Sequence, residues 1–297
     1  MTRPTLPITN LHAALCDGKV LKLPGVHDAL SARLVVEAGF SAAFVSGAGI
    51  SFARLGHADL AFLSLSDMVD AVRAIYDASG LLLLVDIDTG YGNALNTAYA
   101  VRALERVGAA GVQIEDQTAP KRCGHLAGKQ IVPIEEMVGK ISAACDARDR
   151  PQTLVVARTD ALAVTGLKDA LARGEAYIKA GADALFIEAP PSLDAMIRIA
   201  ERFAGRVPLV HNFVEGPNSP ITTMAELANL GYQIGLFPLA CLHAAVPSQR
   251  AILSHLAQTG QTQNWPHAKA DLYDINAIVT LNNLMEKALT FAPLKLE

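Results

Sequence analysis

Eight short apolar runs recur along the chain, and each is followed by a stretch with helical character. The runs are continuous rather than alternating, which predicts strands buried on both faces, as in a parallel sheet. They occupy residues 20–25, 42–46, 82–88, 111–115, 153–160, 184–188, 208–212 and 233–237. Because eight strand–helix units in roughly 250 residues match a closed barrel, the sequence predicts an α/β protein with a (β/α)8 TIM-type barrel.

Glycines mark the ends of several predicted helices. A helix over residues 28–38 ends at Gly39, and the helices before the fourth, sixth and eighth runs end at Gly108, Gly181 and Gly231. Glycine readily adopts the left-handed conformation that follows a helix. A doubly wound open sheet is the competing architecture, but its dinucleotide-binding form needs a G-x-G-x-x-G motif after the first strand, and none follows here.

The end of the chain differs from the repeating part. A polar stretch, residues 259–264, precedes a predicted amphipathic helix over residues 272–289. We therefore expect a barrel with an N-terminal helix over residues 1–258 and a C-terminal helical extension over residues 259–297. A helix beyond a complete barrel has to pack against its own barrel or against a neighbouring subunit.

The composition argues against several classes of protein. Hydrophobic residues make up 51% of the 297 residues, enough for a large core. The net charge is −4 without a cluster of lysines and arginines, which argues against a nucleic-acid partner. No apolar run approaches the ~18 residues that span a membrane, and the N-terminus lacks the apolar core of a signal peptide. We expect a cytoplasmic protein without a membrane partner.

Acidic residues stand where the third and fourth predicted strands end. Asp86 and Asp88 close the third strand and Glu115 closes the fourth, and the carboxyl ends of barrel strands form one rim that carries the chemistry. Alternation along a strand would turn Asp86 and Asp88 to the same side. Converging carboxylates repel one another unless a cation joins them, and oxygen ligands favour Mg²⁺ or Mn²⁺. Asp116 and Asp160 also fit as helix N-caps.

The same rim carries groups that suit a small carboxylic acid. Arg158 ends the fifth run with a planar fork that binds carboxylates, although it also fits as an ion-pair partner of Asp86 or Glu188. Ser46 is followed by the small residues Gly47-Ala48-Gly49, which can present backbone N–H groups to a second carboxylate or carbonyl. The rim therefore predicts a site for a metal-chelating α-oxy or α-keto acid.

Cys123 lies in a polar loop between cationic residues. Lys121-Arg122 precedes it and Gly124-His125 follows it. Nearby cations lower the pKa of a thiol, so this environment predicts a working cysteine. The alternative is a surface loop in which the cysteine has no role.

Four motifs resemble, in order and spacing, those of the isocitrate lyase/phosphoenolpyruvate mutase superfamily. They are Val85-Asp86-Ile87-Asp88-Thr89-Gly90-Tyr91-Gly92, Glu115-Asp116-Gln117, Lys121-Arg122-Cys123-Gly124-His125 and Ala157-Arg158-Thr159-Asp160. The resemblance extends over about Leu23 to Leu256. It implies a (β/α)8 barrel that forms homotetramers, in which C-terminal helices are exchanged between subunits.

The resemblance also implies roles for individual residues. Asp86 would ligate Mg²⁺ directly, while Asp59, Asp88 and Glu115 would hold its waters. Cys123 would be the catalytic acid on a gating loop of about residues 118–132. The residues implied in substrate binding are Ser46, Gly47, Arg158, Glu188 and Asn212.

The loop around Cys123 resembles the carbon–carbon lyase branch, which includes 2-methylisocitrate lyase and 2,3-dimethylmalate lyase. This branch implies cleavage of a 2-hydroxy di- or tricarboxylic acid to an α-keto acid and a carboxylate. In 2-methylisocitrate lyases an arginine after the eighth strand meets an extra carboxylate, and His243 stands at the matching position. With His243, Asn212 and Ser219 in the far half of the site, a dicarboxylic acid bearing alkyl groups fits better than a tricarboxylic acid.

The general base and the exact reaction stay open at this point. A tyrosine near the end of the second strand would serve as base, but Phe44 stands there, so Glu188, His125 and a metal-bound hydroxide are the candidates. Oxaloacetate hydrolysis or decarboxylation and phosphoenolpyruvate mutase-like chemistry are alternatives on the same scaffold. The hydrolases carry serine where Pro238 aligns, which argues against that activity. A non-catalytic barrel that binds a metal and a metabolite is a third hypothesis, against which Cys123 argues.

Overall fold

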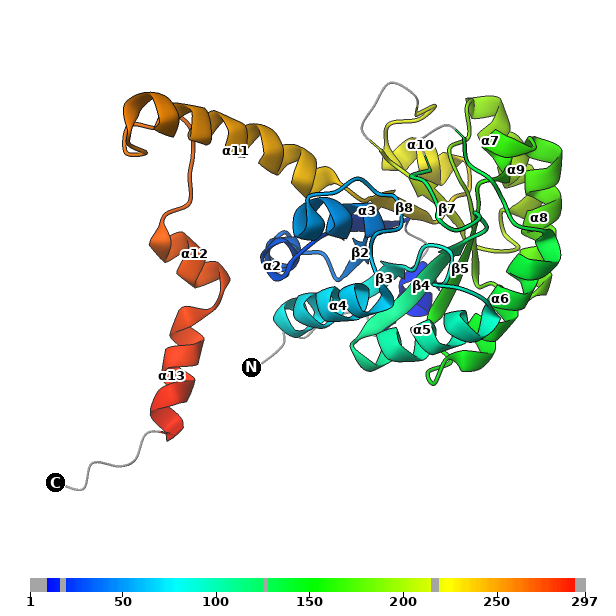
Figure 1. Ribbon diagram of the computed structural model, residues 1–297, viewed down its shortest axis with the longest axis horizontal. Coiled ribbons are helices and arrows are strands. Elements are labelled where there is room, and N and C mark those ends of the chain that lie inside the picture. Colours follow the sequence, from blue (N-terminus) through cyan, green and yellow to red (C-terminus); the bar gives the residue numbers. More distant parts are fainter. Residues whose placement is uncertain (1–9, 17–19, 125–127, 215–218, 292–297) are drawn as a thin grey trace.

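The computed structural model describes residues 10–16, 20–124, 128–214 and 219–291. Eight parallel strands close into a barrel in which consecutive strands pair and β8 pairs with β1 (Figure 1). This confirms the predicted (β/α)8 barrel. The strands are β1 (Leu21–Val26), β2 (Ala42–Val45), β3 (Leu82–Asp86), β4 (Ala109–Glu115), β5 (Leu154–Thr159), β6 (Ala184–Ile187), β7 (Leu209–Asn212) and β8 (Ile234–Phe237).

Helices connect the strands and surround the barrel (Figure 1). The first of them, α2, is capped by Asp28, whose side chain accepts a hydrogen bond from the Ser31 N–H at 2.7 Å, and Gly39 follows with φ of 85°. Within the described ranges, none of the helices has the length and apolar character needed to cross a membrane. The helices around the barrel are α2 (Ala29–Glu37), α3 (Gly47–Ile50), α4 (Leu65–Ser79), α5 (Ala94–Arg106), α6 (Ile134–Ala147), α7 (Ala161–Val164), α8 (Leu167–Lys179), α9 (Leu193–Phe203) and α10 (Met224–Asn229), and a π-helical segment, η1 (Ser51–Leu55), follows α3.

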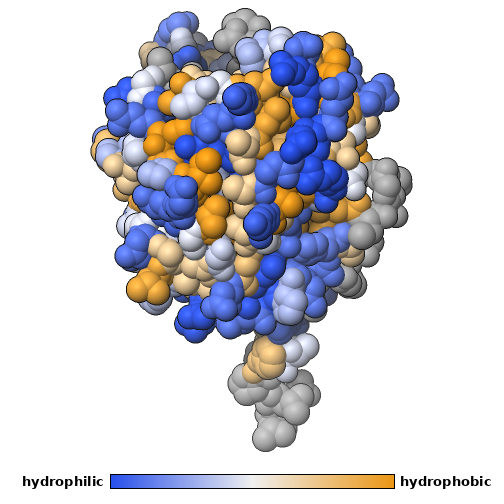
Figure 2. Space-filling view, turned by 90° about the vertical axis from the view of Figure 1, so that its right-hand side faces the viewer, coloured by the Kyte–Doolittle hydropathy of each residue, from blue (hydrophilic) through white to orange (hydrophobic). Residues whose placement is uncertain are grey.

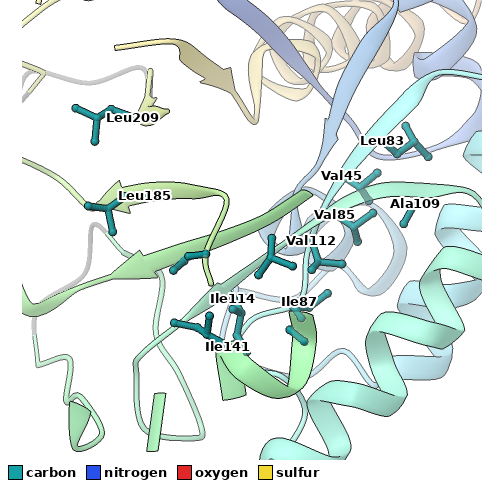
Figure 3. Close-up of a cluster of buried hydrophobic side chains, with 14 of the residues drawn as sticks. Val45, Leu83, Val85, Ile87, Ala109, Val112, Ile114, Ile141, Leu185 and Leu209 are labelled. Atoms are coloured by element: carbon teal, nitrogen blue, oxygen red, sulfur yellow. The ribbon is translucent and has the colours of Figure 1, made fainter. Parts of the chain in front are cut away.

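Side chains on each strand alternate between the barrel interior and the layer under the helices. Leu84 belongs to the interior cluster. Its neighbours Leu83 and Val85 belong to the outer cluster, part of which is drawn in Figure 3. Both clusters are almost fully buried, which explains why the strands are continuous apolar runs. The interior cluster consists of Leu11, Leu23, Ala42, Phe44, Leu84, Leu154, Val156, Ala184, Phe186, Val210, Ile234 and Leu236.

The N-terminal helix α1 (Leu11–Cys16) closes one end of the barrel. Leu11 is fully buried in the interior cluster, and a Cβ on Gly111 would lie only 3.1 Å from its Cδ1 atom. Gly111 and its partner Leu154 stand near the beginnings of β4 and β5. This packing fills the end where the strands begin, and it leaves the opposite rim for a binding site.

The C-terminal part departs from the predicted single helix. Instead of one helix over residues 272–289, α12 (Leu272–Ile278) and α13 (Leu281–Phe291) follow each other. Thr280 between them adopts a left-handed conformation with φ of 59°, which ends the first helix. The preceding helix α11 (Ala240–Thr259) ends one residue past the expected domain boundary at 258, and the division into two domains stays a prediction.

α11, α12 and α13 extend away from the barrel, and the end of this extension projects below it (Figures 1 and 2). α12 touches the barrel where the Arg33 guanidinium on α2 donates to the Ile278 carbonyl at 3.2 Å. Apolar side chains on α12 and α13 are nevertheless open to solvent, with exposed fractions of 71% for Leu272 and 73% for Leu289. These surfaces leave room for the predicted exchange of helices between subunits, which stays a prediction.

Candidate active site

A cavity of about 60 Å³ lies at the rim where the strands end. Eight of the site residues predicted from the sequence are among its described lining residues. The polar part of the lining consists of Ser46, Asp59, Asp86, Gln113, Lys121, Cys123, Arg158, Glu188 and Asn212. The remainder consists of Phe44, Ala48, Gly124, Phe186, Val214, Leu236, Pro238 and Leu239.

Asp86 is the last residue of β3, and its carboxylate accepts hydrogen bonds from the backbone N–H groups of Gly47 at 3.3 Å and Asp88 at 3.1 Å. Asp88 lies past the strand with φ of 49°, so the expectation that strand alternation aligns the two acids was wrong. A left-handed turn brings them together instead. A Cβ on Gly47 would lie 3.2 Å from Asp86 Oδ2 and 3.1 Å from Asp88 Oδ1, so both carboxylates converge on one backbone position.

Lys121 is a buried counter-ion for two of the acids. Its ammonium lies 2.6 Å from Asp59 Oδ1 and 2.9 Å from Asp88 Oδ1. Burial raises the pKa of Asp88 to about 6, although Lys121 acts in the opposite direction. Burial also lowers the pKa of Lys121, but Asp88 and the other nearby carboxylates outweigh this and raise it well above its usual value. From the sequence, Lys121 is only a cation beside Cys123, and its ion pairs become visible only in the fold.

Arg158 on β5 is surrounded by three acids. Its Nε lies 3.0 Å from Asp160 Oδ2 and 3.2 Å from Glu115 Oε2, and its Nη2 lies 3.8 Å from Glu188 Oε1. The guanidinium also lies over the Phe186 ring, 5.4 Å from its centroid. Burial raises the pKa of Glu115 well above its usual value even though Arg158 opposes this. Arg158 therefore lies on the cavity wall and pairs with Glu188, one of the two acids expected, but its shorter ion pairs are with Asp160 and Glu115.

Asp116 and Asp160 do not act as the N-caps that the sequence allowed. Asp160 stands before α7, but its side chain makes no capping hydrogen bond and pairs with Lys129 at 2.7 Å and with Arg158. Asp116 is fully buried and binds side chains of β5 and α8, because the strand ends and the helix layer meet at this point. The donors to Asp116 Oδ2 are Thr159 Oγ1 at 2.7 Å, Tyr177 Oη at 2.7 Å and Arg173 Nη1 at 3.1 Å.

Cys123 lines the cavity from the segment that connects β4 to α6. Before it, Gln117 holds the backbone of Arg122, since its Nε2 donates to the carbonyl at 2.8 Å and its Oε1 accepts from the N–H at 3.0 Å. After it, Gly124 lies against Arg158, where a Cβ would come within 2.3 Å of Nη2. A side chain at this position would require Arg158 or Glu188 to shift, so glycine lets the segment lie against the rim with its cysteine at the cavity.

The remaining predicted site residues are not among the described residues that line the cavity. Gly47 supports Asp86 through its N–H group, and Asp88 and Glu115 adjoin the cavity through Lys121 and Arg158. The Ser219 hydroxyl donates to the Ile221 carbonyl, His243 lies on α11, and neither is among the described lining residues. His125 lies outside the described residues. The roles of these residues stay predictions.

Gln113, Phe186 and Leu236 line the cavity although the sequence did not single them out. Gln113 precedes Glu115 by two positions, and Phe186 precedes Glu188 in the same way. Since side chains of a strand alternate, each of these residues points to the same side as the rim residue that follows it. The residues two positions before Glu115, Glu188 and Pro238 therefore line the cavity, whereas those two positions before Asp86 and Arg158 do not.

The donor chemistry around Asp86 fits a hard divalent cation. Glu115 Oε1 is buried without a hydrogen-bond partner among the described residues, and oxygen is the ligand atom that Mg²⁺ prefers. Six buried acids lie beside three buried cations around this site. The acids are Asp59, Asp86, Asp88, Glu115, Asp160 and Glu188, and the cations are Lys121, Lys129 and Arg158.

The described residues contain no group of three or more His, Cys, Asp or Glu side chains that could hold an ion as they stand. Because Mg²⁺ keeps several waters and needs only one or two carboxylates, direct ligation by Asp86 alone still fits this arrangement.

Residues 10–257 match the family model described as phosphoenolpyruvate phosphomutase. The chain belongs to this family. The similar proteins include enzymes named as lyases. The 2,3-dimethylmalate lyase of Eubacterium barkeri is 39% identical over 90% of this chain and 92% of its own length. The 2-methylisocitrate lyase of Bacillus subtilis (strain 168) is 40% identical over 86% of this chain and 84% of its own.

Solved structures of the phosphoenolpyruvate mutase/isocitrate lyase superfamily share the fold. A crystal structure of 2,3-dimethylmalate lyase has a TM-score of 0.89, with 33% identity over 98% of each chain. Oxaloacetate acetylhydrolase with 3,3-difluorooxalacetate has a TM-score of 0.87, with 33% identity over 93% of each chain. Phosphonopyruvate hydrolase with oxalate and Mg²⁺ has a TM-score of 0.84, with 33% identity over 96% of this chain and 98% of that one. The predicted superfamily is confirmed, and its named lyases identify this member as a carbon–carbon lyase.

Proposed function

We propose that this enzyme uses Mg²⁺ or Mn²⁺ to cleave a 2-hydroxy dicarboxylic acid that bears alkyl groups, giving an α-keto acid and a carboxylate. The observation that carries the proposal is the division of the cavity lining into an ionic part with Cys123 and an apolar part. The relative that cleaves 2,3-dimethylmalate acts on a compound of this class.

Asp86 would hold the ion directly, with Asp59, Asp88 and Glu115 around its waters. When bound, the ion supplies Lewis acidity that lowers the pKa of the α-hydroxyl group of the substrate. The uneven balance of buried acids and cations supports this assignment, because a divalent cation would offset charge that Lys121 and Arg158 leave uncompensated.

The side chains of the enzyme then divide the reaction between them. Arg158 binds the carboxylate next to the hydroxyl group, helped by backbone N–H groups of the Ser46–Ala48 turn. Glu188, which lines the cavity, accepts the hydroxyl proton as C2 becomes a carbonyl and the C2–C3 bond breaks. The electron pair of that bond passes to C3, and the Cys123 thiol donates its proton there. The segment with Gly124 excludes water that would otherwise quench the carbanion. His125 and a hydroxide ion are the alternative bases.

The residues that line the cavity also favour a dicarboxylic over a tricarboxylic substrate. Lys121 and Arg158 are the only cations among the described lining residues, and Lys121 already pairs with Asp59 and Asp88. A buried carboxylate without a partner costs several kcal/mol, on the order of 3–5. Phe186 and Leu236 instead offer apolar surface to alkyl groups.

A substrate series tests this proposal. The purified enzyme with Mg²⁺ is offered 2,3-dimethylmalate, citramalate, isocitrate, 2-methylisocitrate and oxaloacetate, and release of keto acid is followed. We expect a higher kcat/KM for 2,3-dimethylmalate than for 2-methylisocitrate. A clear preference for 2-methylisocitrate would overturn the assignment of the apolar part of the lining. Consumption of oxaloacetate alone would favour the hydrolase activity of the structural relative.

Metal removal tests the ion. Treatment with EDTA is expected to abolish turnover, and Mg²⁺ or Mn²⁺ is expected to restore it, because the buried acids around Asp86 then regain a counter-ion. Full activity in metal-free enzyme, checked by elemental analysis, would contradict the metal assignment.

A further inference from the structure

We propose that Gln117 and Lys129 are positioning residues that hold Cys123 at the cavity by binding backbone groups of its two neighbours, Arg122 and Gly124. Lys129 in addition ties this segment to the ion pairs of Arg158. The proposal deepens the proposed function, and its kinetic part rests on the role assigned there to Cys123.

Gln117 is almost fully buried, with 1% of its surface exposed. Both functional atoms of its amide bind the backbone of Arg122, one as donor at 2.8 Å and one as acceptor at 3.0 Å. Two hydrogen bonds from one planar group fix both the position and the orientation of that residue. The peptide that leads into Cys123 is thereby held from the end of β4.

Lys129 holds the carbonyl group of Gly124, the residue that follows the cysteine. Its buried ammonium donates to the carbonyl of Gly124 and pairs with Asp160 Oδ1 at 2.7 Å. The Lys129 side chain is 3% exposed and that of Asp160 is fully buried, so water competes little for these bonds, which are strengthened by the low local dielectric.

Asp160 connects Lys129 with the cavity. While one of its oxygens binds Lys129, the carboxylate also accepts from Arg158 Nε at 3.0 Å and Nη2 at 3.2 Å. The backbone N–H of Asp160 donates to Asp116 at 2.9 Å, which keeps the acid from moving. The position of Gly124, and with it that of Cys123, is thus coupled through Lys129 and Asp160 to the guanidinium proposed to bind substrate.

This arrangement matters for the thiol because a cysteine side chain has a single rotatable bond before its sulfur. Once its rotamer is set, the sulfur goes wherever the backbone of residues 122–124 places it. Misplacing a reacting group by about 1 Å can cost 10²-fold in rate. Loss of either anchor should therefore slow the chemical step rather than weaken substrate binding, because Arg158 keeps its own ion pairs with Asp160 and Glu115.

The test compares Lys129→Met and Gln117→Met with Lys129→Arg and with Lys140→Met. Lys140 is the matched control, a buried lysine of α6 that pairs with Glu136 at 3.0 Å and lies outside the cavity lining. Each protein is assayed for kcat and KM with the substrate identified above. Amide hydrogen exchange is measured on a peptide that covers residues 121–124, because exchange reports local opening without any need for turnover.

We expect Lys129→Met and Gln117→Met to lower kcat about 10-fold or more with little change in KM, and to speed exchange over residues 121–124 about 10-fold. Lys129→Arg should keep kcat and the exchange rate closer to their wild-type values, since a guanidinium can donate to the Gly124 carbonyl and to Asp160. Lys140→Met should change neither. Unchanged exchange over residues 121–124 in both methionine variants would overturn the proposal, as would equal kinetic losses in Lys140→Met. If the wild-type enzyme turns over none of the hydroxy acids, the proposed function fails, while the exchange measurement still decides the positioning.

Discussion

At the scale of single residues, Cys123 can be tested by the smallest change that removes its acidity. Cys123→Ser is nearly isosteric, so the fold and metal binding should persist, but a hydroxyl is too weak an acid to protonate the carbanion quickly. We expect kcat to fall by about 10²-fold or more, measured by steady-state kinetics. Cys145→Ser is the control, because that thiol donates to the Gly181 carbonyl at 3.2 Å and is not among the described lining residues of the cavity. Near-normal turnover of Cys123→Ser would make the cysteine a bystander.

A second residue-scale test uses the close approach of Gly124 to the rim. A Cβ there would lie 2.3 Å from Arg158 Nη2 and 2.5 Å from Glu188 Oε1. Gly124→Ala should displace the segment and lower kcat/KM about 10-fold or more. Gly139→Ala on α6 is the matched control, because nothing lies within 4 Å of its added Cβ. The control should keep its activity and gain about 0.5–1 kcal/mol in the free energy of unfolding. Equal activity of the two variants would show that the segment does not have to lie against the rim.

At the scale of elements, α8 supports the rim from outside through Asp116. Tyr177→Phe removes the hydroxyl that donates to Asp116 at 2.7 Å and accepts from Arg173 at 3.2 Å, but it leaves the hydrogen bond from Arg173 to Asp116 in place. We expect the free energy of unfolding, measured by urea denaturation, to fall by about 1.5–3 kcal/mol, the net contribution of a hydrogen bond to a charged group. Tyr99→Phe, at a position 67% exposed, should have almost no effect. Equal free energies of unfolding for the two variants would contradict the claim that the hydrogen bond between Tyr177 and Asp116 stabilises the protein.

At the scale of the whole molecule, the open question is what covers α13. Leu284 and Leu289 expose apolar surface on this helix, 39% and 73% respectively, and the predicted homotetramer would bury it against a neighbouring subunit. Leu284→Asp combined with Leu289→Asp should then lower the mass in solution, measured by light scattering after size exclusion. Asn283→Asp on the same helix adds charge without touching apolar surface and should keep the assembly. An unchanged mass in the double variant would contradict a subunit contact through α13.

The barrel could be predicted from local patterns alone. Continuous apolar runs require burial on both faces, and eight of them with intervening helices have few ways to satisfy that requirement. The same patterns place Asp86, Arg158 and Glu188 at strand ends, and hence at one rim. Membership in the superfamily followed from motifs such as Lys121-Arg122-Cys123-Gly124-His125, because short motifs retain their spacing along the chain.

Pairings between distant segments could not be predicted in this way. Lys121 meets Asp59 across 62 positions, and Lys129 meets Asp160 across 31, and no periodicity encodes such contacts. The turn that brings Asp88 to Asp86 and the break at Thr280 both depend on a left-handed backbone that ordinary residues adopt only in a suitable tertiary setting. Hydrophobic pattern is a local property and determines which elements form and which faces they bury. Ion pairs and side-chain hydrogen bonds depend on distances in space, so only the tertiary structure of the barrel determines how the charges are arranged around the cavity.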